Sequence, residues 1–542
     1  MTSPMDRREF MRRSAVAGVL VVGGAPAAGS EPRRTPQPSA RVPEAAELDE
    51  VTIAQLQDGM GSGKYTARSL VDTYLARIDE IDSRGPMVNS VIETNPDALA
   101  IAEALDRERK EKGARGPMHG IPILIKDNID TADRMRTSAG SLALADTRAP
   151  RDASVVERLR AAGAVILGKT NLSEWANFRS THSVSGWSGR GGQTRNPYAL
   201  DRNLCGSSSG TGAAISANFA AVGVGTETDG SIVCPSSANG LVGLKPTVGL
   251  VSRTGIVPIS HTQDTSGPMA RTVTDAAILL GAMVGVDASD GVTRESRGKS
   301  YTDYSQFLTP DGLRGARIGV GRNYFGFNAQ VDRIMDDAIA AMKSAGAAIV
   351  DPANLATKGK FDDAEFDVLL YEFKANLNTY LAKSNSPRKT LAQLIEFNSQ
   401  NRDREMPYFG QEIFERAEKK GPLTSAGYKS ALAKCRKLSR ADGIDALLKK
   451  HRLDAFVAPT GGPAWVIDLL NGDHFTGGSS TPAAVAGYAT ITVPAGFIHG
   501  LPVGMSFIGG AWSEPTLIRL AFGFERAMPA RQPPKFLPTF TA

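Results

Sequence analysis

The chain has 542 residues and a formal net charge of +5; 41% of its residues are hydrophobic and 22% are charged. These values are typical of a soluble globular protein, and a positive charge this small and dispersed argues against nucleic-acid binding. The six histidines are scattered and no CxxC or HExxH motif occurs, so we predict neither a metal site nor a cofactor.

The N-terminus has the three parts of a twin-arginine export signal in their usual order. The pair Arg7-Arg8 is followed two positions on by Phe10, then by an apolar segment, Ala15–Gly24, and by a small-residue cleavage region, Ala25–Ala28. We therefore predict a signal peptide over residues 1–28, use of the twin-arginine export machinery, and a periplasmic or secreted protein.

The mature chain is predicted to begin with a Pro-rich leader and to have no stable membrane anchor. No cysteine stands at the cleavage region to carry a lipid, and no later run of about 18 apolar residues could span a bilayer. The composition of Glu31–Pro43 indicates disorder. We assign residues 29–50 to this disordered leader and residues 51–542 to one folded domain.

Helical and strand-like patterns alternate over the first part of that domain. A period near 3.6 residues distinguishes the helices, and short apolar runs bounded by turn residues distinguish the strands. In chain order we predict a helix from Thr52 broken at Gly59–Gly63, helices at Ala67–Ile81 and Ala98–Lys112, a strand at Ile121–Ile125, a helix at Asp152–Ala162 and a strand at Ala164–Leu167. This alternation predicts an α/β fold.

A long loop, Ser183–Gly212, separates these elements from the rest of the domain. Loops of such length inside a compact domain are usually functional. Beyond it we predict strands at Phe219–Val224, Ala316–Gly321, Ala348–Val350, Asp454–Pro459 and Ala489–Pro494, and helices at Val273–Val284, Val331–Ala345 and through most of Asp362–Arg436.

The run Cys205–Ser231 combines small residues, clustered hydroxyls and an apolar strand, which suits acyl transfer. Small residues let the main chain approach a ligand closely, and the hydroxyls supply nucleophiles. Lys126 ends another apolar strand, and burial disfavours its ammonium form, so it is a candidate neutral base. Two serines and a buried lysine suggest acyl transfer without histidine.

Two familiar nucleophile motifs compete with this interpretation. Gly206–Gly210 reads G-x-S-x-G with Ser208 as nucleophile, but no strand directly precedes it, as such an elbow requires. An S-x-x-K motif occurs at Ser296–Lys299 and at Ser386–Lys389, without the SDN or KTG elements that accompany it in enzymes.

A third arrangement uses all of the notable residues together. Ser231 follows a strand end in a Gly-containing turn, where consecutive N–H groups can point at one oxygen. Ser207 would relay the Ser231 proton to Lys126. We favour this arrangement.

The chain has three cysteines, Cys205, Cys234 and Cys435. This number is too small for a disulfide scaffold, and because it is odd the cysteines cannot all pair. Cys205 and Cys234 flank the two candidate serines and are expected to lie near each other. We favour small buried thiols that pack around the site over a bridge between them.

Three segments resemble the amidase signature family. They are GIPILIKDNI (Gly120–Ile129), the loop CGSSSGTGAA (Cys205–Ala214), and TETDGSIVCPSSANGLVGLKPTVGLVSRTGIVPIS (Thr226–Ser260). The resemblance runs over about Val51–Met528, has its core over about 120–268, and within the family is greatest to bacterial peptide amidases.

The resemblance implies a catalytic triad of Lys126, Ser207 and Ser231, with a cis peptide bond before Ser207. It implies a large mixed twisted β-sheet flanked by α-helices on both sides. It also implies an oxyanion hole made of four main-chain amides, those of Thr228, Asp229, Gly230 and Ser231.

Two positions depart from the wider family. Asp229 replaces one of the two glycines that many members carry before the nucleophile, as it does in peptide amidases. Val233 stands where many members have Arg, which argues against a small substrate with a free carboxylate and against an amidotransferase subunit. Trp175, Phe178 and Trp187, in a stretch of peptide-amidase form, are candidates for the acyl pocket, with aromatic core packing as the other interpretation.

We therefore expect a secreted amidase that hydrolyses a carboxamide to acid and ammonia, with the C-terminal amide of peptides as the favoured substrate. The alternative within the family is an amidase or esterase for other acyl or aryl amides, because specificity lies in the pocket. An exported binding protein is the non-enzymatic alternative, but it would require neither Lys126 nor the two serines.

Overall fold

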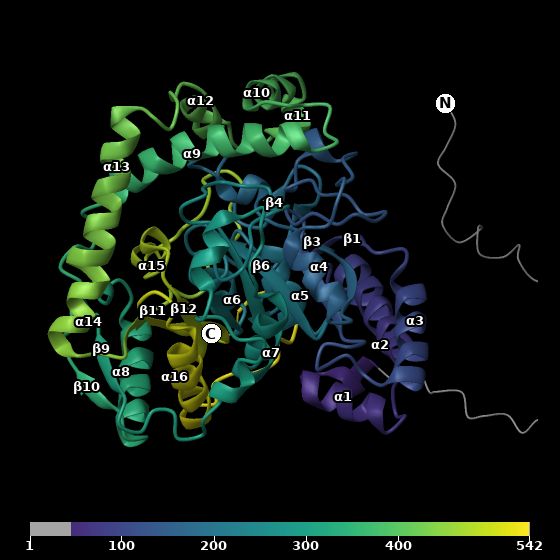
Figure 1. Ribbon diagram of the computed structural model, residues 1–542, viewed down its shortest axis with the longest axis horizontal. Helices are drawn as coiled ribbons and strands as arrows, with labels where there is room; N and C mark the ends of the chain where they lie inside the picture. Colours follow the sequence, from purple (N-terminus) through teal and green to yellow (C-terminus); the bar gives the residue numbers. More distant parts are fainter. Residues whose placement is uncertain (1–44, 541–542) are drawn as a thin grey trace, which may run out of the picture. The chain divides into compact units, whose positions relative to one another are not determined.

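The computed structural model describes residues 45–540 (Figure 1). Eleven strands of this part of the chain form one mixed β-sheet. Its strands are β1 Val91–Thr94, β2 Pro122–Lys126, β3 Val165–Thr170, β6 Val222–Glu227, β7 Val242–Lys245, β8 Thr265–Ala270, β9 Arg317–Val320, β10 Ala348–Val350, β11 Ala455–Pro459, β12 Thr490–Ile498 and β13 Leu501–Ile508. Their order across the sheet is β1-β3-β2-β6-β8-β7-β12-β13-β11-β9-β10. A separate pair, β4 Trp187–Ser188 and β5 Gly192–Gln193, forms a small hairpin.

Parallel and antiparallel pairs both occur in this sheet. β2 lies parallel to β3 and β6, and β9 lies parallel to β10 and β11. The other neighbouring pairs run antiparallel. The expected large mixed sheet of an α/β fold is therefore confirmed.

Sixteen α-helices surround the sheet in the described part of the chain. They are α1 Ile53–Gly61, α2 Ala67–Arg77, α3 Ala98–Lys112, α4 Ser154–Ala161, α5 Ser209–Ser216, α6 Val233–Ala238, α7 Val273–Met283, α8 Ala329–Ser344, α9 Asp362–Lys383, α10 Leu391–Gln400, α11 Arg402–Glu405, α12 Glu412–Glu418, α13 Ala426–Arg436, α14 Asp445–His451, α15 Thr481–Ala486 and α16 Glu514–Ala527. α5 and α6 contact each other over one face of the sheet, and α7, α8 and α16 cover the other. None of the helices within residues 45–540 is both long enough and apolar enough to cross a membrane.

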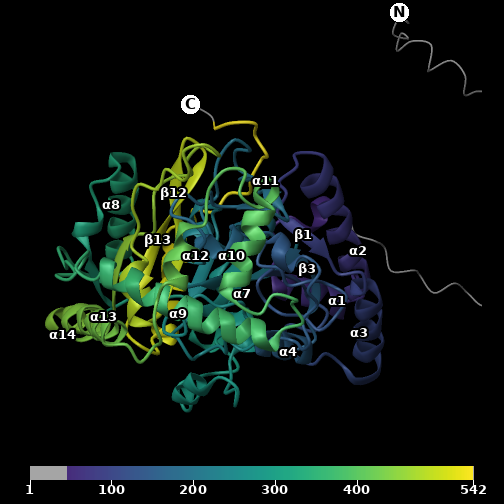
Figure 2. The same cartoon turned by 90° about the horizontal axis from the view of Figure 1, so that it is seen from above.

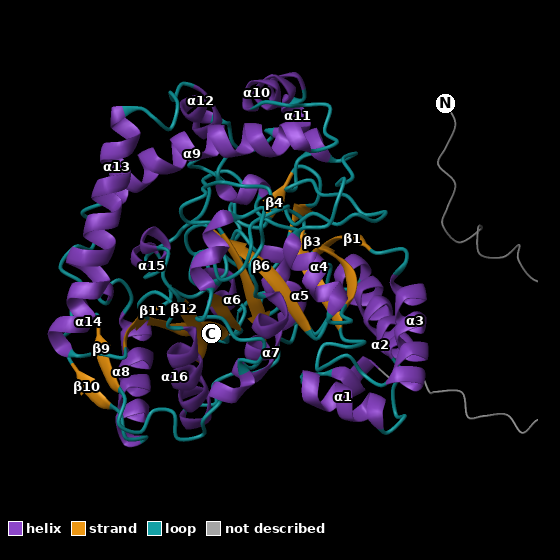
Figure 3. Ribbon diagram, in the orientation of Figure 1, coloured by secondary structure: helices purple, strands orange, loops and turns teal. Residues whose placement is uncertain are grey.

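The helices α9 to α12 form a layer beyond the ends of the central strands, and α13 runs from this layer down one side, in contact with α15 (Figures 1 and 2). In Figure 3 the loops gather between α9 and these strand ends. A hydrophobic cluster fixes the layer in place: Phe373 and Leu377 of α9 and Phe414 of α12 pack with Trp175 and Phe178 from the loops. This layer supplies a roof above the strand ends.

The strand predicted at Phe219–Val224 begins later than expected, at Val222. The reason is the helix before it: α5 ends at Ser216, and the Phe219 N–H still bonds back to a carbonyl of that helix. Asn218 has a φ of +60°, a left-handed turn that redirects the chain. The strand therefore starts only after this turn and ends at Glu227.

Part of the predicted loop Ser183–Gly212 is helical. α5 starts at Ser209 and contains Gly210 and Gly212, which have poor helix propensity. All eight of its residues are buried, and the helix lies against β2 and β6. Tertiary burial here outweighs the local propensity on which the prediction rested.

The folded part begins before residue 51. Ala45–Leu48 forms a 3₁₀ helix and Leu48 is buried. The last residues of the predicted leader, 29–50, therefore belong to the folded domain. The predicted signal, residues 1–28, and the leader up to residue 44 lie outside the described residues.

Candidate active site

Lys126 is the last residue of β2 and lies inside the protein, with none of its surface exposed. Its Nζ is hydrogen-bonded to Ser207 Oγ at 2.8 Å. It is also bonded to Thr226 on β6, to Oγ1 at 2.9 Å and to the main-chain oxygen at 3.3 Å. The lysine thus joins β2 to β6 and to the segment that enters α5.

Burial lowers the pKa of Lys126 from its ordinary value of 10.5 to about 7, because the ammonium form loses its hydration. The charges of Glu227 and Asp264 oppose this shift without cancelling it. Near neutral pH a large share of the molecules therefore carries a neutral amine, whose lone pair can accept a proton from Ser207.

Ser207 follows a cis peptide bond from Gly206, the geometry that the resemblance implies. Its neighbour Ser208 anchors the segment twice. Ser208 Oγ donates to the Thr226 main-chain oxygen at 3.0 Å, and the Ser208 N–H donates to the Ser231 main-chain oxygen at 3.1 Å. The segment is therefore held against both β6 and the turn that carries Ser231.

Beyond β6 the chain turns tightly into α6, and Ser231 lies in this turn. Gly230 has a φ of +79°, and a Cβ there would stand 3.0 Å from Ser480 Oγ, so the turn requires glycine. Glu227 accepts hydrogen bonds from the N–H groups of Ile232, at 2.7 Å, and Val233, at 3.0 Å. A buried carboxylate thus fixes the start of α6.

Asp229 ties this turn to α15. Its carboxylate accepts hydrogen bonds from Ser480 Oγ at 2.5 Å and Thr481 Oγ1 at 2.7 Å. Burial raises the pKa of Asp229, and the two hydroxyl donors oppose that rise. On the other side, Thr228 Oγ1 donates to Asp264 Oδ1 at 2.7 Å, so the turn is anchored at two consecutive residues.

The main-chain N–H groups of Thr228, Asp229, Gly230 and Ser231, the four predicted oxyanion donors, have no hydrogen-bond partner within residues 45–540. The same holds for the Ser231 hydroxyl within that part of the chain. Free donors that follow one another in a fixed turn are what an oxyanion hole requires. The turn therefore combines the candidate nucleophile, Ser231, with free N–H donors.

Ser207 and Ser231 line one cavity of about 450 Å³, a size suited to a small organic or peptidic ligand. Its wall combines apolar side chains with three carboxyl groups and has no Lys or Arg: Ala176, Asn177, Phe178, Ser180, Thr181, Ser183, Gly206, Ser207, Thr228, Asp229, Ser231, Ile259, Glu365, Phe366, Leu369, Ile413, Asp473 and Phe475. Lys126 is not part of this wall and reaches the cavity only through Ser207.

A larger cavity of about 830 Å³ adjoins the first along Ala176, Thr228 and Ile259. Its wall includes Thr226, the partner of Lys126, but neither of the two serines. Because the candidate nucleophile lines only the smaller cavity, we take the smaller one as the candidate active site.

One of the three aromatic candidates lines that cavity. Phe178 does, whereas Trp175 and Trp187 are not among its lining residues, which favours core packing for the two indoles. Trp175 packs edge-on against Phe414, with ring centroids 5.6 Å apart, and Trp187 packs against Phe409 at 5.1 Å. Both indoles are buried against the roof helices and loops, as the core-packing interpretation requires.

Other residues of the cavity wall were not among the site residues predicted from the sequence. Phe366 and Leu369 come from α9, Ile413 comes from α12, and Phe475 comes from the loop before α15. Both helices lie outside the core of the family resemblance, which covers about residues 120–268. Periodicity there predicts a helix, but not which of its residues will face a cavity built by distant parts of the chain.

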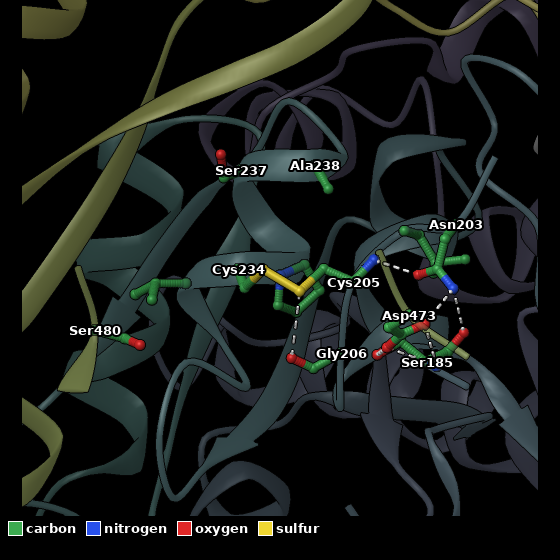
Figure 4. Close-up of a disulfide and its surroundings, with 12 residues drawn as sticks. Ser185, Asn203, Cys205, Gly206, Cys234, Ser237, Ala238, Asp473 and Ser480 are labelled. Carbon is green, nitrogen blue, oxygen red and sulfur yellow. Dashed lines mark hydrogen bonds between the residues drawn. A yellow bond between two sulfur atoms is a disulfide. The ribbon is translucent and has the colours of Figure 1, made fainter. Parts of the chain in front are cut away.

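Cys205 and Cys234 form a disulfide, with their Cα atoms 5.9 Å apart (Figure 4). The favoured prediction of two separate thiols is therefore wrong. The entry to α5 and the first turn of α6 pack against each other, which brings the two sulfur atoms within bonding range. Cys435, in α13, is free and buried.

The competing nucleophile motifs form no site. Ser208 Oγ is engaged with Thr226, and Ser208 does not line the cavity. Ser296 Oγ donates to the Thr293 carbonyl, and Lys389 Nζ donates to the Ser384 carbonyl. Among residues 45–540, no three His, Cys, Asp or Glu side chains gather in a way that could hold a metal ion.

Residues 69–518 match the model of the amidase family. The chain belongs to the amidase signature family. Among its relatives, a probable amidase of Arabidopsis thaliana is 43% identical over 500 residues, which is 90% of this chain and 92% of that protein.

Two solved structures extend the likeness to the whole fold. The peptide amidase of Stenotrophomonas maltophilia shares 50% sequence identity with a TM-score of 0.87, over 90% of this chain and 99% of that one. A peptide amidase in complex with the competitive inhibitor chymostatin shares 51% with a TM-score of 0.88, over 90% and 100%. The chain is thus an enzyme of the class that hydrolyses carbon–nitrogen bonds other than peptide bonds.

Proposed function

We propose that this amidase hydrolyses the C-terminal carboxamide of peptides to the free acid and ammonia through an acyl-enzyme on Ser231. One observation carries the proposal: the buried amine of Lys126 is hydrogen-bonded to Ser207 Oγ, and Ser207 and Ser231 line the same cavity. The identity of 50% to a peptide amidase supports the substrate class.

In the acylation half, Ser231 Oγ attacks the carbonyl carbon of the amide. Its proton passes to Ser207 while the Ser207 proton passes to the neutral amine of Lys126. Free N–H groups in the turn Thr228–Ser231 donate to the developing oxyanion. The carbon–nitrogen bond then breaks, Lys126 returns the proton through Ser207 to the nitrogen, and ammonia leaves.

In the deacylation half, a water molecule takes the place of ammonia. The relay of Ser207 and Lys126 removes a proton from this water as its oxygen attacks the acyl carbon. The bond to Ser231 Oγ breaks, and the relay returns the proton to that oxygen. The product is the free acid, and the enzyme is restored.

The shape of the cavity supports a blocked C-terminal residue as substrate. Apolar side chains, among them Phe178, Phe366 and Phe475, suit the side chain next to the amide. The wall has no cation that would hold a free carboxylate, in line with Val233 in place of the Arg of many relatives. The acid product accordingly has no ion-pair partner that would delay its release.

The test is a matched panel of amides, in which the ammonia released from each primary amide or the aniline released from the anilide is measured. It contains an N-acetyl dipeptide amide, the anilide of the same dipeptide, and two amides without a peptide, hexanamide and a fatty amide. We expect kcat/KM to be at least about tenfold higher for the peptide amide than for the others. Ser231→Ala protein, purified in parallel, controls for contaminating amidases. Higher kcat/KM for the anilide or the aliphatic amides would instead establish the alternative, an amidase for other acyl or aryl amides.

We also propose that the enzyme acts outside the cytoplasm. The proposal rests on the order of paired arginines, apolar segment and small-residue site in residues 1–28.

A further inference from the structure

The disulfide joins the two segments that carry the proposed catalytic serines. Cys205 stands two residues before Ser207, and Cys234 stands three residues after Ser231. Figure 4 shows the bond running directly between the entry to α5 and the first turn of α6, with Gly206 beside it. Any change in this bond therefore acts on both serines at once.

Away from the serines, Asn239 at the end of α6 donates to the Leu204 carbonyl at 3.3 Å. Close to the serines, the same two segments are also joined at Ser208. Its N–H donates to the Ser231 main-chain oxygen and its Oγ to the Thr226 main-chain oxygen, at 3.1 and 3.0 Å. In sequence, Ser207 lies between the disulfide and this second attachment. Without the disulfide, hydrogen bonds and packing alone would hold the two segments together here, and the Ser208 attachment could act as a hinge about which they turn.

Each half of the disulfide is itself held rigidly. The Cys205 N–H donates to Asn203 Oδ1 at 2.8 Å, and its carbonyl accepts from Ser209 Oγ at 2.7 Å. Asn203 in turn donates to Asp473 Oδ1 at 3.1 Å, as Figure 4 shows. On the other side, the Cys234 N–H donates to the Gly230 carbonyl at 2.8 Å, inside the proposed oxyanion turn. The bond thus connects two well-anchored points rather than two loose loops.

We propose that Cys205 and Cys234 are positioning residues for acylation: their disulfide holds Ser207 at the distance from Ser231 that proton transfer requires. This inference rests on the proposed function, because it assigns the bond to the Ser231–Ser207–Lys126 relay. Displacement of a reacting group by about 1 Å can reduce a rate by about 100-fold, so a hinge between the serines reduces kcat even in a folded protein.

The competing role is a brace that only stabilises the fold. A disulfide stabilises mainly by restricting the unfolded chain, so removing a mere brace lowers Tm and leaves kcat unchanged well below Tm. The two roles therefore differ in kcat, measured where every variant is fully folded.

The experiment compares the double variant Cys205→Ala/Cys234→Ala with wild type and with Cys435→Ala, which removes a buried thiol outside both segments. All three are assayed at least 15 °C below the lowest Tm, by peptide-amide hydrolysis and by the rate of Ser231 labelling with a fluorophosphonate. In that labelling the serine oxygen bonds to phosphorus, fluoride leaves, and the serine proton passes into the relay. We expect about a tenfold or larger fall in kcat and in labelling rate for the double variant, with KM changed less than about twofold. Cys435→Ala should behave as wild type.

Equal kcat and equal labelling rates in wild type and double variant, with only Tm lowered, would overturn the positioning role. A wild type that is not labelled at Ser231 would instead refute the proposed function, so the two failures are distinguishable.

If the double variant does not fold, a thiol reductant is applied to folded wild type and to Cys435→Ala. Cys234 is partly exposed, so the reductant can reach the bond. A reversible loss of labelling rate in both, with circular dichroism unchanged, supports positioning; full activity after complete reduction overturns it.

Discussion

At the scale of single residues, three buried lysines show why only one suits a base. Lys126, Lys169 and Lys245 have no exposed surface, and burial lowers the pKa of each. Lys169 donates to two carbonyls and to the Thr137 hydroxyl, partners that suit a permanent donor. Lys245 donates to the Pro246 carbonyl. Only Lys126 touches a hydroxyl that lines the candidate active site, and that hydroxyl can give up a proton.

The pH dependence of activity should follow Lys126. Since only the neutral amine accepts a proton, kcat/KM should rise with pH through one ionisation near pH 7 and then level off. Lys126→Arg keeps the charge but cannot lose it, so it should be at least about 1000-fold less active at every pH. Steady-state rates between pH 5 and 9 measure both. If the Arg variant kept a tenth of wild-type activity, Lys126 would not be the base.

Stability should depend on pH through the same residue. The folded pKa of Lys126, about 7, lies below the ordinary value of 10.5, so between these values the unfolded chain binds one more proton than the folded protein. The free energy of unfolding of wild type, relative to Lys126→Met, should therefore rise with pH across this window, by at most about 1.4 kcal/mol per pH unit. Urea unfolding of both proteins at pH 7, 8 and 9 measures the difference. A constant difference would mean that burial does not shift this pKa.

Replacing the proposed nucleophile should abolish turnover without harm to the fold. Ser231→Ala deletes one oxygen that makes no hydrogen bond within the described residues, so Tm should change by no more than a few degrees. Amide hydrolysis should fall by about 10⁴-fold or more, because no acyl-enzyme can form. Circular dichroism, Tm and ammonia release test the two halves of this prediction. Retained activity in protein free of contaminants would exclude Ser231 as nucleophile.

At the scale of elements, the candidate site is a meeting of turns with a helical roof. Strand ends and the entries to α5 and α6 supply the reacting groups, and α9 and α12 supply apolar wall. The loop between β11 and α15 adds Phe475, whose side chain stays 54% exposed while it lines the cavity. The candidate reacting groups and the apolar wall of the cavity therefore come from different elements, so the wall can vary while the candidate reacting groups stay fixed.

The loop before α15 offers a matched pair of variants. Phe475→Ala removes apolar surface from the cavity wall and should raise KM for peptide amides by roughly fivefold, about 1 kcal/mol, with little effect on kcat. Leu470→Ala changes the same loop at a residue that is 88% exposed and outside the cavity wall, so its KM should equal that of wild type. Peptide-amide kinetics of the two variants measure the contrast. Equal KM values for Phe475→Ala and wild type would place substrate elsewhere.

At the scale of the whole molecule, residues near both ends of the described chain meet at one ion pair. Arg531 pairs with Glu50 at 2.6 Å, and it donates to the main-chain oxygens of Ser216, at the end of α5, and Gly240, after α6. Both helices begin at the candidate site. The folded domain thus uses a residue near each of its ends to hold the helices that carry the site.

Export should depend on the first arginine pair. Arg7→Lys/Arg8→Lys should leave the enzyme in the cytoplasm, because the twin-arginine machinery reads that pair. Arg12→Lys/Arg13→Lys makes the same chemical change five residues later and should be exported normally. Cell fractionation with an amidase assay of each fraction measures both. Export of the first variant at the normal level would remove the basis for this localisation.

A feature of this protein can be predicted from the sequence alone when the residues that create it lie close together along the chain. Lys126, Ser207 and Ser231 could be named as candidates because each stands in a short segment whose pattern is local: an apolar strand end, a Gly- and Ser-rich loop, a turn that needs Gly230. The α/β class followed in the same way, from periodicities that extend over ten or so residues.

The tertiary structure alone decided which residues surround that chemistry. The disulfide of Cys205 and Cys234, the core positions of Trp175 and Trp187, and the cavity wall from α9 and α12 all join parts of the chain far apart in sequence. Composition permits each of these side chains to be core, wall or surface. Packing chooses among them, because an aromatic ring or a thiol is placed by the neighbours that bury it, and those neighbours are set by how the helices close over the sheet.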